Sequence, residues 1–250
     1  MPAKKKVDPK YRLIFADELP EIEFVTSGMG DKKTTIGFPR KRITEVYGLQ
    51  GVGKTTLTLM SIASMTKEGQ KTLFIDCENS FNKKWAVALG VDLSKLVVAE
   101  VSILEEVSDV ILNEISHFDA IVVDSVAAMV PRAEFEGEAG DANVALKARL
   151  MGQLMRKVNS PLVDSKCALI FINQLRENIG EMFGPKYSTP GGLALKYAAS
   201  LRIELKAFAR DRMEKTVAGE KKRIGHTVTA EITKSKVGKP FESVTFDVIY

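Results

Sequence analysis

Short apolar runs alternate with longer stretches of mixed polarity through most of the chain. Five runs rich in β-branched and aliphatic residues predict strands at Ile43–Tyr47, Thr72–Ile75, Leu96–Ala99, Ala120–Val123 and Leu169–Ile172. Helical spacing of apolar residues predicts helices near 54–67, 82–89, 103–116 and 141–158. Because nearly continuous apolar strands alternate with helices, we expect an α/β fold with a largely parallel, twisted sheet and helices on both faces.

Two parts of the chain depart from this pattern. Beyond residue 199, apolar and polar residues alternate in Leu201–Leu205, Thr227–Thr233 and Val244–Tyr250. Such alternation is typical of strands with one face in solvent, so we expect an antiparallel extension at the C-terminal end of the sheet. Before residue 42 there is a basic tail, an isolated apolar run at Tyr11–Phe15 and a turn-rich stretch. We therefore divide the chain into an N-terminal segment, 1–41, and a core, 42–250.

Composition narrows the class of protein only slightly. The chain has 250 residues, 45% of them hydrophobic and 27% charged, and no apolar run approaches the ~20 residues that cross a bilayer. The net charge of +4 permits a nucleic-acid partner without requiring one. The basic N-terminus lacks the apolar stretch of a secretory signal. Cys77 and Cys167 lie in apolar runs, which favours buried thiols in a cytoplasmic protein with no membrane partner.

The most specific motif lies between the first core strand and the helix that follows it. The run Gly48-Leu49-Gln50-Gly51-Val52-Gly53-Lys54-Thr55 matches the phosphate-binding pattern G-x-x-x-x-G-K-[ST]. Its glycines let backbone N–H groups face phosphate oxygens, Lys54 neutralises β- and γ-phosphate charge, and the Thr55 hydroxyl ligates Mg²⁺. The alternative is an ordinary glycine turn before a helix. The motif predicts ATP with Mg²⁺ and these ATP-binding residues: Gly48, Gln50, Gly51, Val52, Gly53, Lys54, Thr55 and Thr56.

Acidic residues follow two of the predicted buried strands. Asp124 ends the run Ala120–Val123, and in phosphate-binding-loop folds a carboxylate so placed holds the Mg²⁺ shell through water. Glu78 follows the strand Thr72–Ile75 and is a candidate for polarising the water that attacks the γ-phosphate. The alternative for Glu78 is a helix cap or a solvated acid. Since the carboxyl ends of parallel strands meet at one edge of a sheet, both acids are expected near the phosphate-binding loop.

Together these residues resemble the RecA family of homologous recombinases from about Arg42 to Tyr250. The resemblance is carried by Glu45–Thr56, Phe74–Glu78, Val122–Ala128, Glu134–Asp141, Ile170–Arg176 and Gly191–Tyr197. It implies a RecA-like ATPase core for residues 42–250. It also assigns Glu78 as the catalytic glutamate and Gln174 as a γ-phosphate sensor that passes its state to the next loop.

The resemblance implies further nucleotide contacts. Trp85 matches an aromatic residue that packs on adenine, although a core aromatic residue is the alternative. Asn82 stands where the family often has an aspartate near the adenine amino group. Lys234 and Lys236 match two lysines that reach the ATP of the adjacent subunit, and residues two apart on a strand point the same way. The alternative for this lysine pair is a solvated strand edge.

Two loops and one helix are candidates for DNA contact. Residues 175–192 form a long glycine-rich stretch that matches the second DNA loop of the family, with Arg176, Ile179, Gly191 and Gly192 as candidate contacts. Residues 134–141 match the first DNA loop, but their four acidic side chains are not expected to face phosphate. Arg149, Gln153 and Arg156 share one face of the predicted helix 141–158. An ordinary solvated face is the alternative for that ridge, and the family uses both arginine positions near the DNA backbone.

The resemblance implies an ATP-dependent protein that forms filaments on single-stranded DNA and exchanges strands with homologous duplex DNA. Its partners would be both kinds of DNA and further copies of itself, with ATP between protomers. The N-terminal segment differs from that of bacterial members, and the isolated run Tyr11–Phe15 would pack either on its own core or on a neighbouring subunit, of which we expect the neighbour. Larger bacterial members continue beyond the position matching Tyr250, so the sequence suits a compact, phage-encoded or minimal recombinase acting in a bacterial or phage-infected cell. The alternatives are an ATP-gated coat or annealing protein for single strands, and a RecA-core DNA motor.

Overall fold

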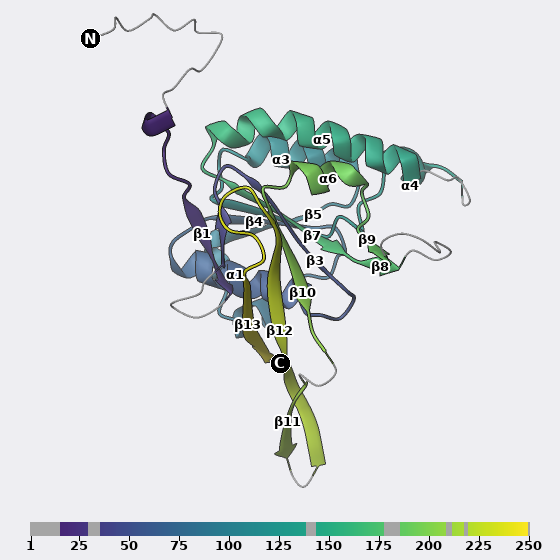
Figure 1. The fold of residues 1–250 in the computed structure, drawn as a ribbon. Coiled ribbons are helices and arrows are strands. Elements are labelled where there is room, and N and C mark those ends of the chain that lie inside the picture. The colour runs from purple at the N-terminus through teal and green to yellow at the C-terminus, as the bar shows by residue number, and fades with distance from the viewer. Residues whose placement is uncertain are drawn as a thin grey trace, which may run out of the picture.

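The computed structural model describes residues 16–29, 36–138, 144–177, 186–208, 212–217 and 220–249. Figure 1 shows a central twisted sheet with helices packed on both faces. One buried cluster lies between the sheet and the helix that follows the phosphate-binding loop, and a second lies between the sheet and the longest helix. The expected three-layer α/β fold is confirmed. Within these ranges, no helix is long and apolar enough to span a membrane.

The parallel part of the sheet has the order β10-β3-β7-β6-β4-β5. Its strands are β3 (Ile43–Gly48), β4 (Thr72–Asp76), β5 (Leu96–Glu100), β6 (Ala120–Asp124), β7 (Ala168–Gln174) and β10 (Leu201–Lys206). Every residue of β3, β4 and β6 is buried, which explains their continuous apolar sequence. Strand β5 lies at the edge and is only partly buried. The order brings the carboxyl ends of β3, β7, β6 and β4 side by side.

The predicted helices are present and divide between the two faces of the sheet. The helices are α1 (Lys54–Lys67), α2 (Lys83–Ala88), α3 (Leu104–Glu114), α4 (Arg132–Glu136), α5 (Val144–Asp164) and α6 (Leu193–Ala198), with 3-10 turns at Ala16–Glu18 and Leu93–Lys95. Buried side chains of α1 and α2 belong to one core cluster, and those of α3, α5 and α6 belong to the other. Helix α5 continues past Pro161 to Asp164, beyond its expected end near residue 158.

The antiparallel extension is present beyond β10, but β10 itself, expected to belong to it, runs parallel to β3 and is mostly buried. The long strand β12 (Glu220–Ser235) pairs with β10, with β11 (Arg212–Val217) and with β13 (Ser243–Ile249). Strand β11 and the first residues of β12 form a hairpin that projects from the body of the molecule in Figure 1. The sequence predicted β13 and the second half of β12, and it did not predict β11.

A β-hairpin in the N-terminal segment was not predicted. It pairs β1 (Phe24–Met29) with β2 (Ile36–Pro39) and packs against α1, where the Ser61 hydroxyl donates a hydrogen bond to the Ser27 carbonyl oxygen at 2.6 Å. Val25 and Met29 are buried in the core cluster beneath α1. This stretch was expected only to be rich in turns. The run Tyr11–Phe15, expected to dock on a neighbour, lies outside the described residues.

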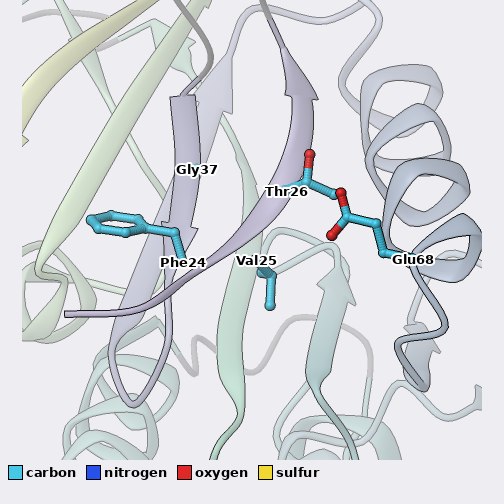
Figure 2. Close-up of a pocket in the computed structure, with 5 residues that line it drawn as sticks. All are labelled: Phe24, Val25, Thr26, Gly37 and Glu68. Carbon is cyan, nitrogen blue, oxygen red and sulfur yellow. The ribbon is translucent and has the colours of Figure 1, made fainter. Parts of the chain in front are cut away.

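A groove of about 450 Å³ opens beside this hairpin and is shown in Figure 2. It is lined by Phe24, Val25, Thr26, Gly37 and Glu68. In Figure 2 the side chain of Thr26 points toward Glu68, and the Phe24 ring extends to the other side of the hairpin. None of the predicted nucleotide or DNA contacts lines this groove, so the candidate site lies elsewhere.

Candidate nucleotide site and DNA-facing elements

The phosphate-binding loop joins β3 to α1, as the motif predicts. Gly48 is the last residue of β3, and Gly53 precedes the first turn of α1 with a φ of 92°. A side chain at Gly53 would be strained in this left-handed conformation. The carbonyl oxygen of Gly53 accepts the first helical hydrogen bond from the Leu57 N–H at 2.8 Å. The loop therefore places the N-terminus of α1 beside the expected phosphate position.

Lys54 lies against the loop with its side chain almost fully buried, at 8% exposure. Its ammonium group donates hydrogen bonds to the carbonyl oxygens of Leu49 at 2.8 Å and Gly48 at 3.2 Å. Burial lowers the pKa of Lys54, and the nearby charges of Asp124 and Glu78 oppose that shift. The cation is thus held at the mouth of the loop, where the motif requires it.

Thr55 and Asp124 meet where a Mg²⁺ ion would be expected. The Thr55 hydroxyl donates a hydrogen bond to Oδ2 of Asp124 at 2.8 Å. Asp124 is 2% exposed at the end of β6, and burial raises its pKa to about 6. Mg²⁺ prefers oxygen ligands and often takes one or two from protein while phosphates and water supply the rest. This pair of oxygen donors therefore fits the ion.

Glu78 is held from two neighbouring strands. Its Oε1 accepts a hydrogen bond from the Ser125 hydroxyl at 2.5 Å and another from the Gln174 side-chain amide at 3.2 Å. Ser125 follows β6, and Gln174 ends β7. The carboxylate is exposed, and these two hydrogen bonds fix its position. Sequence reasoning named Glu78 and Gln174, but it assigned no role to Ser125, whose only signal was its place directly after Asp124.

Asp76 shapes the turn that carries Glu78. It is buried at the end of β4, and its carboxylate accepts the N–H groups of Glu78 at 3.2 Å and Phe81 at 2.7 Å. Sequence reasoning grouped Asp76 with the acids after this strand without separating its role from that of Glu78. The two hydrogen bonds show that Asp76 positions the backbone while the Glu78 carboxylate points toward β6 and β7.

The candidate adenine contacts lie at the start of α2. The side-chain oxygen of Asn82 accepts the Trp85 N–H at 3.0 Å, so Asn82 caps this helix. The Trp85 ring is partly buried and packs against the core cluster beneath α1. The position of the Asn82 side chain is explained by helix capping, and the burial of part of the Trp85 ring is explained by core packing. Their contacts with adenine stay predictions.

Lys234 is partly buried and Lys236 is exposed, and both ammonium groups form hydrogen bonds to the end of α6. Near the end of β12, Lys234 donates to the carbonyl oxygens of Lys196 at 2.7 Å and Tyr197 at 3.0 Å. Lys236 donates to the same Tyr197 oxygen at 3.1 Å. Burial lowers the pKa of Lys234, and the charge of Lys236 lowers it further. Both ammonium groups therefore cap the last turn of α6.

A buried polar network ties the end of the predicted second DNA loop to the sheet. The Asn173 amide donates to the Pro190 carbonyl oxygen at 3.1 Å and to the fully buried Glu45 carboxylate at 2.9 Å. Arg202 neutralises Glu45 through a hydrogen bond of 2.6 Å. Its guanidinium carbon lies over the Tyr47 ring, 4.4 Å from the ring centroid. Sequence reasoning missed this network because its members are distant in the chain.

Gly191 and Gly192 connect that network to α6. Gly192 has a φ of 74°, and a Cβ atom there would lie 2.9 Å from the Cβ of Ala148 on α5. Only glycine fits such a close approach in this conformation. The expected DNA loop is not wholly irregular, since β8 (Arg176–Glu177) pairs with β9 (Tyr187–Ser188) at its ends. Arg176 is exposed there, and Ile179 lies outside the described residues.

The candidate DNA ridge on α5 is exposed. Arg149, Gln153 and Arg156 all face solvent, while Met151, Leu154, Met155 and Val158 are buried on the opposite side. Lys147 lies on the same helix, and its pKa is lowered by burial and then by the charge of Arg176. The close approach of Gly192 to Ala148 places the start of α5 beside the end of the predicted second loop. The predicted first loop begins within α4, and its residues 139–141 lie outside the described ranges.

Comparison with known proteins covers most of the chain. A family model described as the RecA N-terminal domain matches residues 16–250. Protein RecA of Clostridium acetobutylicum is 44% identical over 216 residues, which are 86% of this chain and 60% of that protein. Protein RecA of Streptomyces coelicolor is also 44% identical over 216 residues, 56% of its length. The chain thus spans a little over half the length of these relatives, and it belongs to the RecA family.

Proposed function

We propose that this chain is an ATP-dependent recombination protein that forms filaments on single-stranded DNA and promotes homologous pairing and strand exchange. The observation that carries the proposal is the hydrogen bond from Gln174 to Glu78. It connects the candidate hydrolytic carboxylate to the residue directly before the candidate DNA loop. A phosphate-binding loop alone would serve many ATPases, whereas this connection suits an ATPase that responds to DNA.

The nucleotide site divides the work among its side chains. Lys54 offsets phosphate charge, and its present bonds to Gly48 and Leu49 are exchanged for bonds to phosphate oxygens. Thr55 and Asp124 would hold Mg²⁺, which stabilises the negative charge that develops on the phosphates. Glu78 orients and polarises the attacking water. Ser125 keeps the carboxylate in place for that step.

Strand β7 connects the nucleotide site to the candidate DNA loop, so a difference between the ATP-bound and product states is transmitted to that loop through β7. A γ-phosphate competes with Glu78 for the Gln174 amide, so Gln174 shifts between two acceptors. Gln174 is followed by Leu175 and then by Arg176 at the start of the loop hairpin. The other end of this loop is anchored by Asn173 through Pro190. A movement at the end of β7 therefore acts on both ends of the loop.

DNA and a neighbouring protomer complete the proposed assembly. The exposed ridge Arg149–Gln153–Arg156 on α5 and Arg176 on β8 offer cationic contacts to the backbone of a single strand. Gly191 and Gly192 bring backbone N–H groups close to the same side. Lys234 and Lys236 leave the α6 carbonyl oxygens and reach the ATP of the adjacent protomer. A cytoplasmic location is part of the same proposal.

The test measures ATP hydrolysis with and without single-stranded DNA, and then strand exchange after a homologous duplex is added. Hydrolysis stimulated by DNA together with exchange supports the proposal. Stimulation without exchange favours a coat or annealing protein, or a DNA motor, and images of open filaments or closed rings separate those two. Absence of stimulation would contradict the DNA assignment while leaving the nucleotide site in place.

A further inference from the structure

His226 lies directly behind the phosphate-binding loop. It belongs to β12, is 2% exposed, and its Nε2 is 3.2 Å from the carbonyl oxygen of Val52. A carbonyl oxygen only accepts hydrogen bonds, so Nε2 must carry the hydrogen and donate it. A Cβ atom built at Gly53 would lie 3.5 Å from the same nitrogen. The imidazole therefore contacts the loop backbone at Val52 and lies beside Gly53, the last residue before Lys54.

The geometry of a peptide bond gives this contact a consequence. In a planar trans peptide the C=O of one residue and the N–H of the next point in opposite directions. The Val52 oxygen points toward His226 on β12, so the Gly53 N–H points away from β12. In a phosphate-binding loop the N–H groups that cradle the phosphates lie on the inner side of the loop, which here is the side away from β12. Holding the Val52 oxygen thus also orients a donor to phosphate.

The surroundings explain why a polar ring at this position needs its hydrogen bond. Val52, Leu205 and Val248 are buried close to the loop and belong to the same apolar core cluster as each other. An aliphatic side chain would suit packing alone, and burying an imidazole costs free energy unless its nitrogens are paired. Packing is the competing explanation, so a test has to separate the hydrogen bond from the volume of the ring.

We propose that His226 is a positioning residue for phosphate binding, which orients the Val52–Gly53 peptide so that the Gly53 N–H faces the β-phosphate. The inference rests on the proposed nucleotide site and adds a residue that lies outside the glycine-rich motif. It deepens that function because a strand of the antiparallel extension then contributes to nucleotide affinity.

Three variants of His226 separate the effect of its hydrogen-bond donor from the effect of its ring volume. In His226→Gln the side-chain amide can reach the position of Nε2, whereas in His226→Asn it is too short, and His226→Leu fills space without a donor. His117→Leu is the matched control because His117 is exposed and contacts Glu114. The dissociation constants of ADP and of adenosine, which lacks phosphate, are measured by competition against a fluorescent ATP analogue, and thermal midpoints are recorded for each protein.

We expect His226→Asn and His226→Leu to weaken ADP binding by about 3- to 10-fold, the effect of removing one hydrogen bond. Adenosine affinity stays unchanged in every variant, and His226→Gln retains ADP affinity within about twofold, which is within the spread of such contributions. Equal losses for Gln and Leu, or lowered thermal midpoints with unchanged ADP affinity, would overturn the inference. Failure of the unmodified protein to bind ADP would instead refute the proposed nucleotide site itself.

Discussion

The side-chain amide of Gln174 lies 3.2 Å from Oε1 of Glu78, so two residues 96 positions apart share one hydrogen bond. The bond joins the end of β7 to the turn after β4, across the intervening strand β6. Ser125, at the end of β6, donates to the same oxygen. Three neighbouring strand ends therefore act on one carboxylate, and each can be tested separately.

Replacing Gln174 should uncouple hydrolysis from DNA. In Gln174→Met the length of the side chain is kept and the amide is removed, so neither Glu78 nor a γ-phosphate can be engaged. We expect nearly unchanged ATP affinity and a fall of about 10-fold in the stimulation of hydrolysis by single-stranded DNA, within the usual range of coupling free energies. Gln70→Met, which removes an amide just before β4, at the end of the strand opposite Asp76, is the matched control and should keep full stimulation by DNA. Full stimulation in Gln174→Met would remove Gln174 from the coupling path.

Replacing Glu78 should affect turnover far more than binding. Glu78→Gln keeps the shape of the side chain and loses its basicity, so ATP turnover should fall by about 100-fold or more, the usual contribution of a positioned general base. The variant should remain on single-stranded DNA after ATP is added, which a fluorescence anisotropy time course can follow. Glu68→Gln, exposed at the end of α1 and away from the predicted DNA loops, is the matched control. Rapid turnover in Glu78→Gln would rule out the assigned role.

The correctly predicted parts of the fold are those in which a short, continuous run of residues is enough to predict burial. Strand β3 and strand β6 are buried on both faces, so their apolar runs could be recognised without knowledge of their partners. The turn residues of the phosphate-binding loop likewise lie in one short segment. Since carboxyl ends of parallel strands meet at one edge, the grouping of Asp124 and Glu78 followed from their positions, whereas Gln174 was named only through the family resemblance.

The missed features depend on tertiary contacts. The strand β1 contains Thr26, Ser27 and Gly28, which are typical of turns, and its structure comes from packing on α1. The network of Glu45, Asn173 and Arg202 joins three strands and leaves no periodic pattern. His226 is one polar residue in a half-buried strand. Its contact with the loop depends on the path of β12 behind the loop, which the sequence does not reveal.

The exposed ridge on α5 should contribute charge to DNA binding without reading sequence. We expect the double variant Arg149→Gln/Arg156→Gln to bind single-stranded DNA more weakly. The slope of log affinity against log salt should be reduced by about 0.7 for each phosphate that the variant no longer neutralises. Binding of oligonucleotides of different sequence should weaken equally. Titrations at several salt concentrations measure both quantities.

The control for that experiment is Lys67→Gln at the exposed end of α1, which packs on the opposite face of the sheet. It changes the net charge by one without touching the ridge. If the slope falls by the same amount per charge removed in the control and in the α5 variant, the effect is general electrostatics and the ridge has no special place in DNA binding.

The two thiols should make stability fall at alkaline pH. Burial raises the pKa of Cys77 and of Cys167 to about 12, so both stay protonated in the folded protein while unfolded thiols ionise above about pH 8.5. Unfolding then releases protons, and the free energy of unfolding should decline by about 1.4 kcal/mol per pH unit for each thiol between these values. Urea denaturation at pH 8 and pH 10 measures the decline. In the variant Cys77→Ala/Cys167→Ala this part of the decline should vanish, and an unchanged decline would mean that other groups cause it.

The two lysines at the end of β12 can be tested for action on a neighbouring protomer by mixing inactive proteins. A double variant Lys234→Met/Lys236→Met retains Glu78, and Glu78→Gln retains both lysines. If the lysines act across the interface, a mixture contains sites that combine Glu78 of one protomer with the lysines of the next. Random head-to-tail assembly at equal concentrations would place such a pair at about one quarter of the interfaces. We therefore expect DNA-dependent ATP hydrolysis in the mixture although each variant alone is inactive.

The control is Lys239→Met, which changes a nearby exposed lysine and should be active by itself. Inactive mixtures that still form filaments would show that Lys234 and Lys236 act within their own protomer, through the α6 carbonyl oxygens that they contact here.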